Sequence, residues 1–213
     1  RELLDLFYDL EIPLLKVLFE MEREGIFLDA DLLKSMSEKL HARIKTISEE
    51  IFDLAGEEFL INSPKQLSHI LFEKLNIPPP KKTATGFSTN AEVLESLISE
   101  YPIAEKLLIY RSLEKLRSTY VDALPNEVTP HTQRIHCSFM QYVAATGRLS
   151  CQNPNLQNIP TRTPEGKAVR EAFSPQKQGW SFLAADYSQI ELRLLAHFSE
   201  DPTLIEAFLQ NKD

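Results

Sequence analysis

The chain of 213 residues is 43% hydrophobic and 25% charged, a composition typical of a globular protein with one large or two small domains. No apolar stretch approaches the ~20 residues that a membrane-spanning helix needs, so no membrane partner is expected. Cys137 and Cys151 are widely spaced and accompany only five histidines, which excludes a zinc pattern and predicts free thiols in a reducing compartment.

The net charge of −8 is distributed unevenly along the chain. Residues 1–102 have a net charge of −8, residues 103–180 carry 10 basic and 6 acidic groups, and residues 181–213 have a net charge of −4. A positive middle segment followed by an acidic end is the arrangement that a DNA track leading to a metal site requires.

The first helix is predicted over residues 2–24, where leucines and other apolar side chains recur at helical spacing. Pro13 should kink this helix or divide it into two, because proline cannot donate the backbone hydrogen bond that a helix interior needs. Gly25 is expected to end it.

A second and unusually long helix is predicted over residues 30–54, with one apolar stripe along its length. Either Asp29 or Asp31 can cap its first turn, and Gly56 is expected to stop it.

A sharp helix start is predicted at Ser63, which can cap the helix while Pro64 occupies its first position. Gln66 can close a capping box with Ser63. The helix must stop before the three prolines at 78–80, and a polar loop follows over residues 81–88.

Two further helices are predicted before residue 125. Thr89 is expected to cap a short one, and Pro102 is expected to open a longer one that spans residues 103–124.

From Pro125 the pattern changes. Ile135, Cys137 and Phe139 alternate with polar neighbours, which predicts an exposed strand. Residues 146–166 are rich in glycine, asparagine and proline and show no helical period, so they are expected to form a long functional loop.

An apolar run over residues 180–185 predicts a buried strand, and an amphipathic helical pattern begins at Ile190. Asp186 would lie at the end of that strand, where a rigidly held carboxylate can serve as a metal ligand or a general base. The alternative is that Asp186 only caps the next helix.

Three segments resemble the family A DNA polymerases, the bacterial DNA polymerase I type. The run Asp-Tyr-Ser-Gln-Ile-Glu-Leu-Arg at 186–193 resembles the first palm signature of that family. The runs Ala-Thr-Gly-Arg-Leu-Ser at 145–150 and Asn-Pro-Asn-Leu-Gln-Asn-Ile-Pro at 153–160 resemble the DNA-binding stretch that precedes this signature. Weaker similarity extends to residue 1.

The resemblance implies an α+β fold that is mostly helical, with thumb helices followed by a partial palm that has a few antiparallel strands. Residues 1–28 would be connector helices at the base of palm and thumb, residues 29–125 the helical thumb, and residues 126–213 the N-terminal part of the palm. The second catalytic carboxylate and the triphosphate-binding helix of the family have no counterpart in these 213 residues. The chain is therefore expected to be a fragment that is inactive by itself.

For the reaction, the resemblance implies that Asp186 bridges two Mg²⁺ ions and that the backbone carbonyl of Tyr187 is a further metal ligand. Glu191 would lie beneath the sugar and exclude a 2′-hydroxyl, so that Asp186 and Glu191 are the implied catalytic residues. The nucleotide pocket is implied to contain Ser188, Gln189, Ile190 and Glu191.

The segment from Lys115 to Tyr120, together with the lysines at 81 and 82, offers ammonium groups and hydroxyls of the kind that contact phosphates. From the residues alone, a solvated helix face explains the same pattern. The resemblance implies a thumb that grips the DNA backbone through Lys81, Lys82, Lys115, Ser118 and Thr119.

A second group consists of fork-shaped donors in the long loop. Purine N3 and pyrimidine O2 acceptors are present in the minor groove of every base pair, so such donors can hold any correctly paired duplex. Asparagine-based turns are the structural alternative for this loop. The resemblance implies DNA binding near the primer terminus by Arg148, Asn155, Gln157, Asn158 and Arg162.

The leading interpretation is a piece of a template-directed DNA polymerase. It implies primer-template DNA and dNTP as partners, no protein partner, and a location in the bacterial cytoplasm with the nucleoid. A non-catalytic module that binds duplex DNA and a helical interaction scaffold, which the acidic residues 1–102 would suit, are the alternatives.

Overall fold

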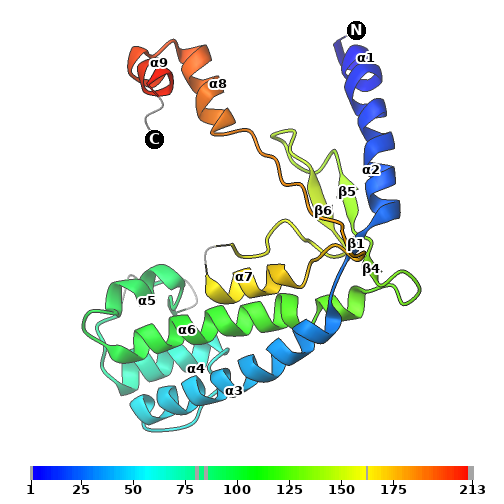
Figure 1. Cartoon of the computed structure of the whole chain (residues 1–213). Helices are drawn as coiled ribbons and strands as arrows, with labels where there is room; N and C mark the ends of the chain where they lie inside the picture. The colour runs from blue at the N-terminus through cyan, green and yellow to red at the C-terminus, as the bar shows by residue number, and fades with distance from the viewer. Residues whose placement is uncertain (1, 80–81, 84–85, 162, 211–213) are drawn as a thin grey trace. The chain divides into compact units, whose positions relative to one another are not determined.

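The computed structural model describes residues 2–79, 82–83, 86–161 and 163–210, in two compact units that comprise Arg1–Ser174 and Pro175–Asp213. The fold is α+β and mostly helical, as predicted, with three two-stranded antiparallel sheets in the described residues (Figure 1). In the same residues, no helix is both long and apolar enough to cross a membrane.

The predicted first helix is interrupted near Pro13, as expected. It consists of α1 (Glu2–Leu6), the π-helical turn η1 (Phe7–Glu11) and α2 (Ile12–Glu24), and Pro13 lies in the first turn of α2. Gly25 comes next with φ 62°, and a Cβ there would lie 2.5 Å from the backbone oxygen of Ile135. Only glycine fits this turn, which therefore ends the helix.

The long second helix is confirmed as α3 (Ala30–Ala55). Asp29, rather than Asp31, is its cap, because its carboxylate accepts a hydrogen bond of 2.9 Å from the Leu32 backbone N–H. Gly56 ends α3 in the left-handed conformation, with φ 73°.

The helix start at Ser63 is also confirmed, but without the capping box. Ser63 caps α4 (Pro64–Ser68), which continues as the π-helical turn η2 (His69–Lys74). The side-chain oxygen of Gln66 instead accepts a hydrogen bond of 2.7 Å from the Leu60 N–H, because the incoming chain folds back over the helix start.

Strands β2 (Lys82–Thr83) and β3 (Gly86–Phe87) form a short antiparallel pair before α5 (Ala91–Leu97). The predicted cap was wrong by one residue, since Asn90 accepts from the Val93 N–H at 3.1 Å. Thr89 is buried, and both its hydroxyl and its carbonyl accept hydrogen bonds from Arg111. Thr89 is therefore hydrogen-bonded to Arg111 of α6, and Asn90 caps α5 in its place.

Pro102 opens α6 (Pro102–Leu116), and the helix predicted over 103–124 ends at residue 121, with a change from α to π geometry at residue 117. A π-helical turn, η3 (Arg117–Val121), comes directly after it, and then a 3₁₀ turn, η4 (Leu124–Glu127). The change of helix type coincides with side-chain contacts to α3 that the local sequence does not reveal.

The predicted strand over 135–139 is two strands in two different sheets. β4 (Arg134–Ile135) pairs with β1 (Ile26–Phe27), and β5 (Ser138–Met140) pairs with β6 (Ser150–Gln152). The expected long loop is therefore interrupted by β6, and α7 (Pro164–Glu171) begins before the loop was expected to end. Three-residue strands are stabilised by their partners and leave almost no periodic signal in the sequence.

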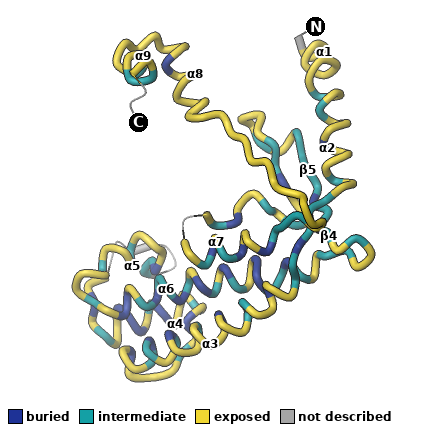
Figure 2. The backbone as a smooth tube through the Cα atoms, in the orientation of Figure 1, coloured by how far each residue is buried: buried dark blue, intermediate teal, exposed yellow. Residues whose placement is uncertain are grey.

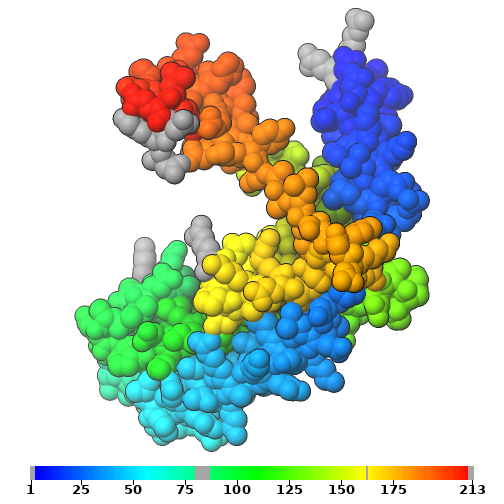
Figure 3. All heavy atoms as spheres, in the orientation of Figure 1, coloured from blue at the N-terminus to red at the C-terminus, as the bar shows by residue number. Residues whose placement is uncertain are grey.

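Two hydrophobic clusters lie in the first unit, and α3 and α6 contribute to both. One joins the second half of α3 to α4, η2, α5 and the start of α6. The other joins the first half of α3 to the end of α6, to η3, and to Ile135, Ile159, Val169 and Ala172. Figure 2 shows the buried faces of α3 and α6, and Figure 3 shows α7 seated against these helices. Leu113, Leu116 and Tyr120 of the second cluster also line the cavity of the candidate site.

The second unit contains α8 (Ile190–Ser199) and α9 (Pro202–Leu209). Asp201 caps α9 by accepting a hydrogen bond of 2.9 Å from the Leu204 N–H.

Candidate nucleic-acid interface

The end of α6 and the turn η3 expose three of the predicted phosphate-binding side chains. Lys115 lies in the last turn of α6, and Ser118 and Thr119 lie in η3, all three exposed to solvent. They are kept outward because the opposite face buries apolar side chains in the second cluster, namely Leu113, Leu116, Tyr120 and Val121. The Ser118 hydroxyl donates to the Glu114 carbonyl at 2.7 Å, so its proton has to turn away from the helix before it can be donated to a phosphate oxygen.

The loop after β6 is fastened to this face through Tyr120. Its hydroxyl donates to the backbone oxygen of Asn158, and the next residue, Ile159, is buried in the second cluster. Burial raises the pKa of the Tyr120 hydroxyl above its usual range, so that the proton it donates is retained. Residues about 40 positions apart in sequence thereby become neighbours.

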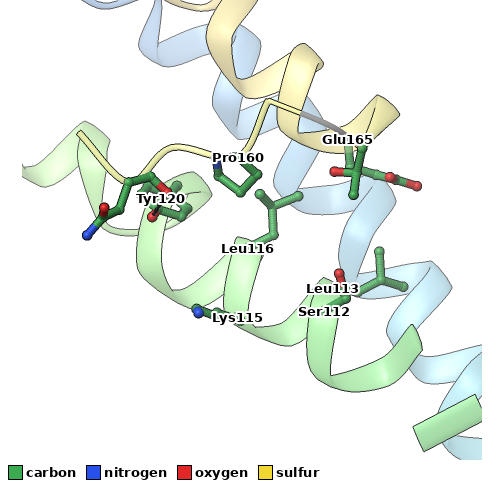
Figure 4. Close-up of a pocket in the computed structure, with 9 residues that line it drawn as sticks. Ser112, Leu113, Lys115, Leu116, Tyr120, Pro160 and Glu165 are labelled. Atoms are coloured by element: carbon green, nitrogen blue, oxygen red, sulfur yellow. Dashed lines mark hydrogen bonds between the residues drawn. The ribbon is translucent and has the colours of Figure 1, made fainter. Parts of the chain in front are cut away.

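A cavity of about 230 Å³ lies where these segments meet (Figure 4). Lys115 and Asn158, two residues predicted to bind DNA, both line it, as do Ser112 and Thr163. Glu165 also lines the cavity, but its carboxylate is paired with Arg43 of α3. Hydrogen bonding to backbone N–H and to Arg43 lowers the pKa of Glu165, so it stays ionised.

Two of the predicted groove-binding side chains hold the loop itself. The Asn155 carboxamide accepts from the Gln157 backbone N–H at 3.0 Å, which is the asparagine turn that was the structural alternative. The Gln157 side chain accepts from the Cys151 N–H at 3.0 Å and donates to the Leu149 carbonyl at 3.1 Å. Contact of these two residues with DNA stays a prediction.

Arg148 is exposed in the connection between β5 and β6 and comes directly after Gly147, whose φ of 77° places a turn there. Lys81 and Arg162 lie outside the described residues, as does the side chain of Lys82 in β2.

Helix α7 packs closely on the loop that contains Pro160 and was not predicted from the sequence. A Cβ added at Gly166 would lie 2.7 Å from the Pro160 Cβ and carbonyl oxygen, so glycine permits this approach. Thr163 caps α7 by accepting from the Gly166 N–H at 3.0 Å, with Pro164 at the first helical position. The same pairing of a hydroxyl cap and a proline predicted the helix at Ser63, so this signal was available.

In the second unit, the buried strand predicted over 180–185 is not formed. These residues are extended and exposed, and Leu183 is 94% accessible. A strand needs a partner for its backbone hydrogen bonds, and within the described residues none pairs with this run. Asp186 and Tyr187 are consequently exposed as well.

The residues predicted to bind the nucleotide lie together at the start of α8. Gln189 is the N-cap, with φ 50° and no side-chain capping bond, so Asp186 does not cap this helix. Glu191 lies in the first turn, and the Arg193 Nε donates to the Ser188 carbonyl at 2.9 Å. The Arg193 guanidinium also lies over the Phe208 ring, with its carbon 4.7 Å from the ring centroid.

Residues 30–213 match the family model described as DNA polymerase family A. The chain belongs to the family A DNA polymerases. It is 51% identical over 210 residues to DNA polymerase I of Bacillus subtilis (strain 168), 50% identical over 209 residues to that of Bacillus caldotenax, and 52% identical over 214 residues to that of Chloroflexus aurantiacus. These alignments cover 98–99% of this chain and 23–24% of the relatives, so it spans about a quarter of their length.

A solved structure from the same family has the same fold. The POL domain of Pol1 from M. smegmatis, in complex with DNA primer-template and dNTP, is 42% identical, with a TM-score of 0.90. The match covers 99% of this chain and 37% of that one. The similarity to family A polymerases that the motifs indicated therefore extends to the backbone fold.

Family A polymerases are generally metal-dependent, and the exposed carboxylate of Asp186 fits that requirement. Mg²⁺ prefers hard oxygen ligands and is often held by one or two carboxylates. Throughout the described residues, however, no group of three His, Cys, Asp or Glu side chains lies close enough together to hold a metal.

Proposed function

We propose that the polymerase to which this chain contributes performs template-directed DNA synthesis by adding dNTPs to the 3′-hydroxyl of a primer. The observation that carries the proposal is the convergence of Lys115 and Asn158 on one cavity, beside the exposed hydroxyls of Ser118 and Thr119. Its support comes from the Pol1 relative, which was solved with primer-template and dNTP.

On the DNA side, Lys115 supplies a point charge to the duplex backbone and the two hydroxyls of η3 supply hydrogen bonds. Such contacts fix the position of a duplex without reading its sequence. Arg148 and Asn158 are assigned to the minor groove near the primer terminus, where a mispaired base would displace the acceptors that they contact. A replicating enzyme needs this sequence-independent check.

On the reaction side, Asp186 and the Tyr187 carbonyl are the proposed metal ligands. Two bound Mg²⁺ ions would supply activation of the primer hydroxyl and charge stabilisation at the transferred phosphate. Glu191, in the first turn of α8, is proposed to exclude a 2′-hydroxyl, while Ser188, Gln189 and Ile190 contact the nucleotide.

The proposed subdomains follow the family pattern, with connector helices at 1–28, a thumb at 29–125 and the first part of the palm at 126–213. The thumb assignment is supported by the first hydrophobic cluster, whose buried members all lie between Ile47 and Tyr110. The 213-residue chain by itself is proposed to be inactive, because a two-metal reaction needs more carboxylate ligands than Asp186 alone.

The decisive test is Asp186→Asn in the full-length polymerase. We expect the rate of dNTP addition to fall by more than about a hundredfold, because the amide is a poor ligand for Mg²⁺. The Kd for primer-template DNA should stay within about threefold, since Asp186 does not belong to the DNA-binding face.

Glu200→Gln is the matched control, because Glu200 is an exposed carboxylate at the other end of α8. It should leave both the rate and the Kd unchanged. A polymerisation rate of Asp186→Asn within tenfold of the unsubstituted enzyme would refute the metal role and favour a non-catalytic DNA-binding module.

A further inference from the structure

Arg117 occupies the junction of α6 and η3, and its guanidinium is engaged almost completely by other side chains. Its Nε and Nη2 donate to the Glu114 carboxylate at 3.1 and 2.6 Å. Its Nη1 donates to Asp122 and also to the Nε2 of His41, the latter at 3.2 Å. Four of its five N–H groups are therefore occupied, and its side chain is only 20% exposed.

This arrangement argues against Arg117 as a phosphate ligand, although its place in the sequence beside Lys115 and Ser118 suggests that role. The Glu114 and Asp122 carboxylates surround its charge, and the Glu114 hydrogen bonds raise its pKa further. A DNA phosphate would have to displace carboxylates that already match the guanidinium geometry. The side chain is thus directed at the protein.

Arg117 and Asp122 lie at opposite ends of the π-helical turn, and they contact each other in two ways. The Asp122 backbone N–H donates to the Arg117 carbonyl at 2.8 Å, and the Asp122 carboxylate accepts from the Arg117 guanidinium. The same pair therefore closes the turn twice, once through the backbone and once through the side chains. π-helical turns are uncommon and occur often at functional sites, because they re-aim the side chains that they contain.

Two residues of α3 form hydrogen bonds with Arg117 and Asp122. The Ser37 hydroxyl donates to the second Asp122 oxygen at 2.6 Å. Because a guanidinium can only donate, His41 must accept at Nε2, so its Nδ1 carries the proton and donates to the Ser37 carbonyl at 2.9 Å. Ser37, His41, Arg117 and Asp122 form one connected network, here called the η3 clamp.

The turn that the η3 clamp closes contains the side chains proposed to contact DNA. Ser118 and Thr119 point outward, whereas Tyr120 points inward and donates to the Asn158 carbonyl. A helix advances by about 100° per residue, so loss of the extra residue of the π turn would rotate the neighbouring side chains by about that angle. Both the hydroxyls and the Tyr120 tether would then be misdirected.

We propose that the η3 clamp is a positioning site for DNA binding, which fixes the π-helical turn so that Ser118 and Thr119 face the duplex backbone. Its residues act through that turn and do not contact DNA. This inference rests on the proposed function, because it assigns a task to residues whose DNA contact is itself a proposal.

The test is Asp122→Asn in the full-length polymerase, with the Kd for primer-template DNA measured over a series of salt concentrations. Simple electrostatics predicts equal or tighter binding, because the substitution removes a negative charge near DNA. The clamp predicts about tenfold weaker binding, the amount that one or two lost hydrogen bonds allow. The slope of log Kd against log salt should not change, since hydroxyl contacts release no counterions, whereas losing one phosphate-bound cation would lower it by about 0.9.

Ser37→Ala is the second variant, because it removes one hydrogen bond of the clamp from the far side without changing any charge. It should weaken DNA binding about threefold while kcat at saturating DNA stays within twofold. Glu127→Gln, in the neighbouring turn η4, is the control that removes a charge outside the clamp, and it should not weaken binding.

The outcomes separate the two proposals. If the unsubstituted polymerase binds primer-template and adds dNTPs while Asp122→Asn and Ser37→Ala bind as tightly as it does, the clamp is refuted and the proposed function stands. If the unsubstituted polymerase fails to bind primer-template at all, both proposals fail. A reduced salt slope in Arg117→Gln would show that Arg117 contacts phosphate directly, and would overturn the positioning role.

Discussion

At the scale of single residues, the two cysteines show how far burial controls chemistry. Cys137 and Cys151 are free thiols, as their spacing predicted, and both are buried. Burial raises the pKa of the Cys137 thiol to about 12, and a hydrogen bond with Cys151 acts in the same direction. A thiol reacts through its ionised form, so Cys137 is protected in the folded chain.

This shift predicts a loss of stability in alkaline solution. An unfolded cysteine ionises near pH 8.5, whereas folded Cys137 keeps its proton until about pH 12. Between those values the folded state binds more protons, so the free energy of unfolding falls as pH rises, by up to about 1.4 kcal/mol per pH unit. Urea denaturation of the chain from pH 8 to 11 measures this.

Other groups titrate in the same range, so Cys137→Ala is the control. The substituted chain should be less stable at pH 7, because a buried sulfur is removed, but its stability should decline less steeply with pH. Equal slopes for the two proteins would contradict the assigned shift.

At the scale of secondary-structure elements, three capping predictions were confirmed, whereas the cap predicted at Thr89 was wrong by one residue. Asp29, Ser63 and Gly56 act where they were expected, because a cap needs only its own turn of backbone. The change from α to π geometry after residue 116 was not predicted; Asp122, which closes the π turn, accepts a hydrogen bond from Ser37, 85 residues away in sequence. Local propensity contains no information about such a partner.

The contact between α7 and the loop that contains Pro160 allows a prediction at this scale. Gly166→Ala should destabilise the chain by about 1–3 kcal/mol, because the new methyl group would lie 2.7 Å from Pro160, including its backbone oxygen. It should also weaken DNA binding in the full-length polymerase, since the loop would move away from Lys115. Thermal unfolding and the primer-template Kd are the measurements.

Lys167→Ala, at an exposed position of the same helix, is the matched control and should change stability by less than about 0.5 kcal/mol. If Gly166→Ala were as stable as this control, the close approach of α7 to the loop would be wrong.

At the scale of the whole molecule, the chain divides into two compact units at residues 174 and 175. Directly after Pro175, the second unit has a segment, residues 176–189, whose residues are all exposed and lie in no described helix or strand. Exposed segments without regular structure are preferred sites of proteolysis.

We therefore expect trypsin to cut the 213-residue chain first at Lys177, which is exposed within this segment. The product should be a stable species that ends there and retains both hydrophobic clusters. Mass spectrometry of a brief digestion identifies the site, and Lys177→Gln should remove the early cut. An early cut within α3 or α6 instead would show that the first unit is not compact.

The sequence by itself determined the helix boundaries set by local caps, the mostly helical class, and the family, because each depends on residues that are contiguous in the chain. Only the tertiary structure decided the rest. It joined Lys115 to Asn158 at one cavity, paired β6 with β5, turned Arg117 toward the protein, and left residues 180–185 exposed. The reason is physical: a hydrogen bond or a buried contact between residues far apart in sequence depends on where the chain places both partners, and local periodicity describes only one of them.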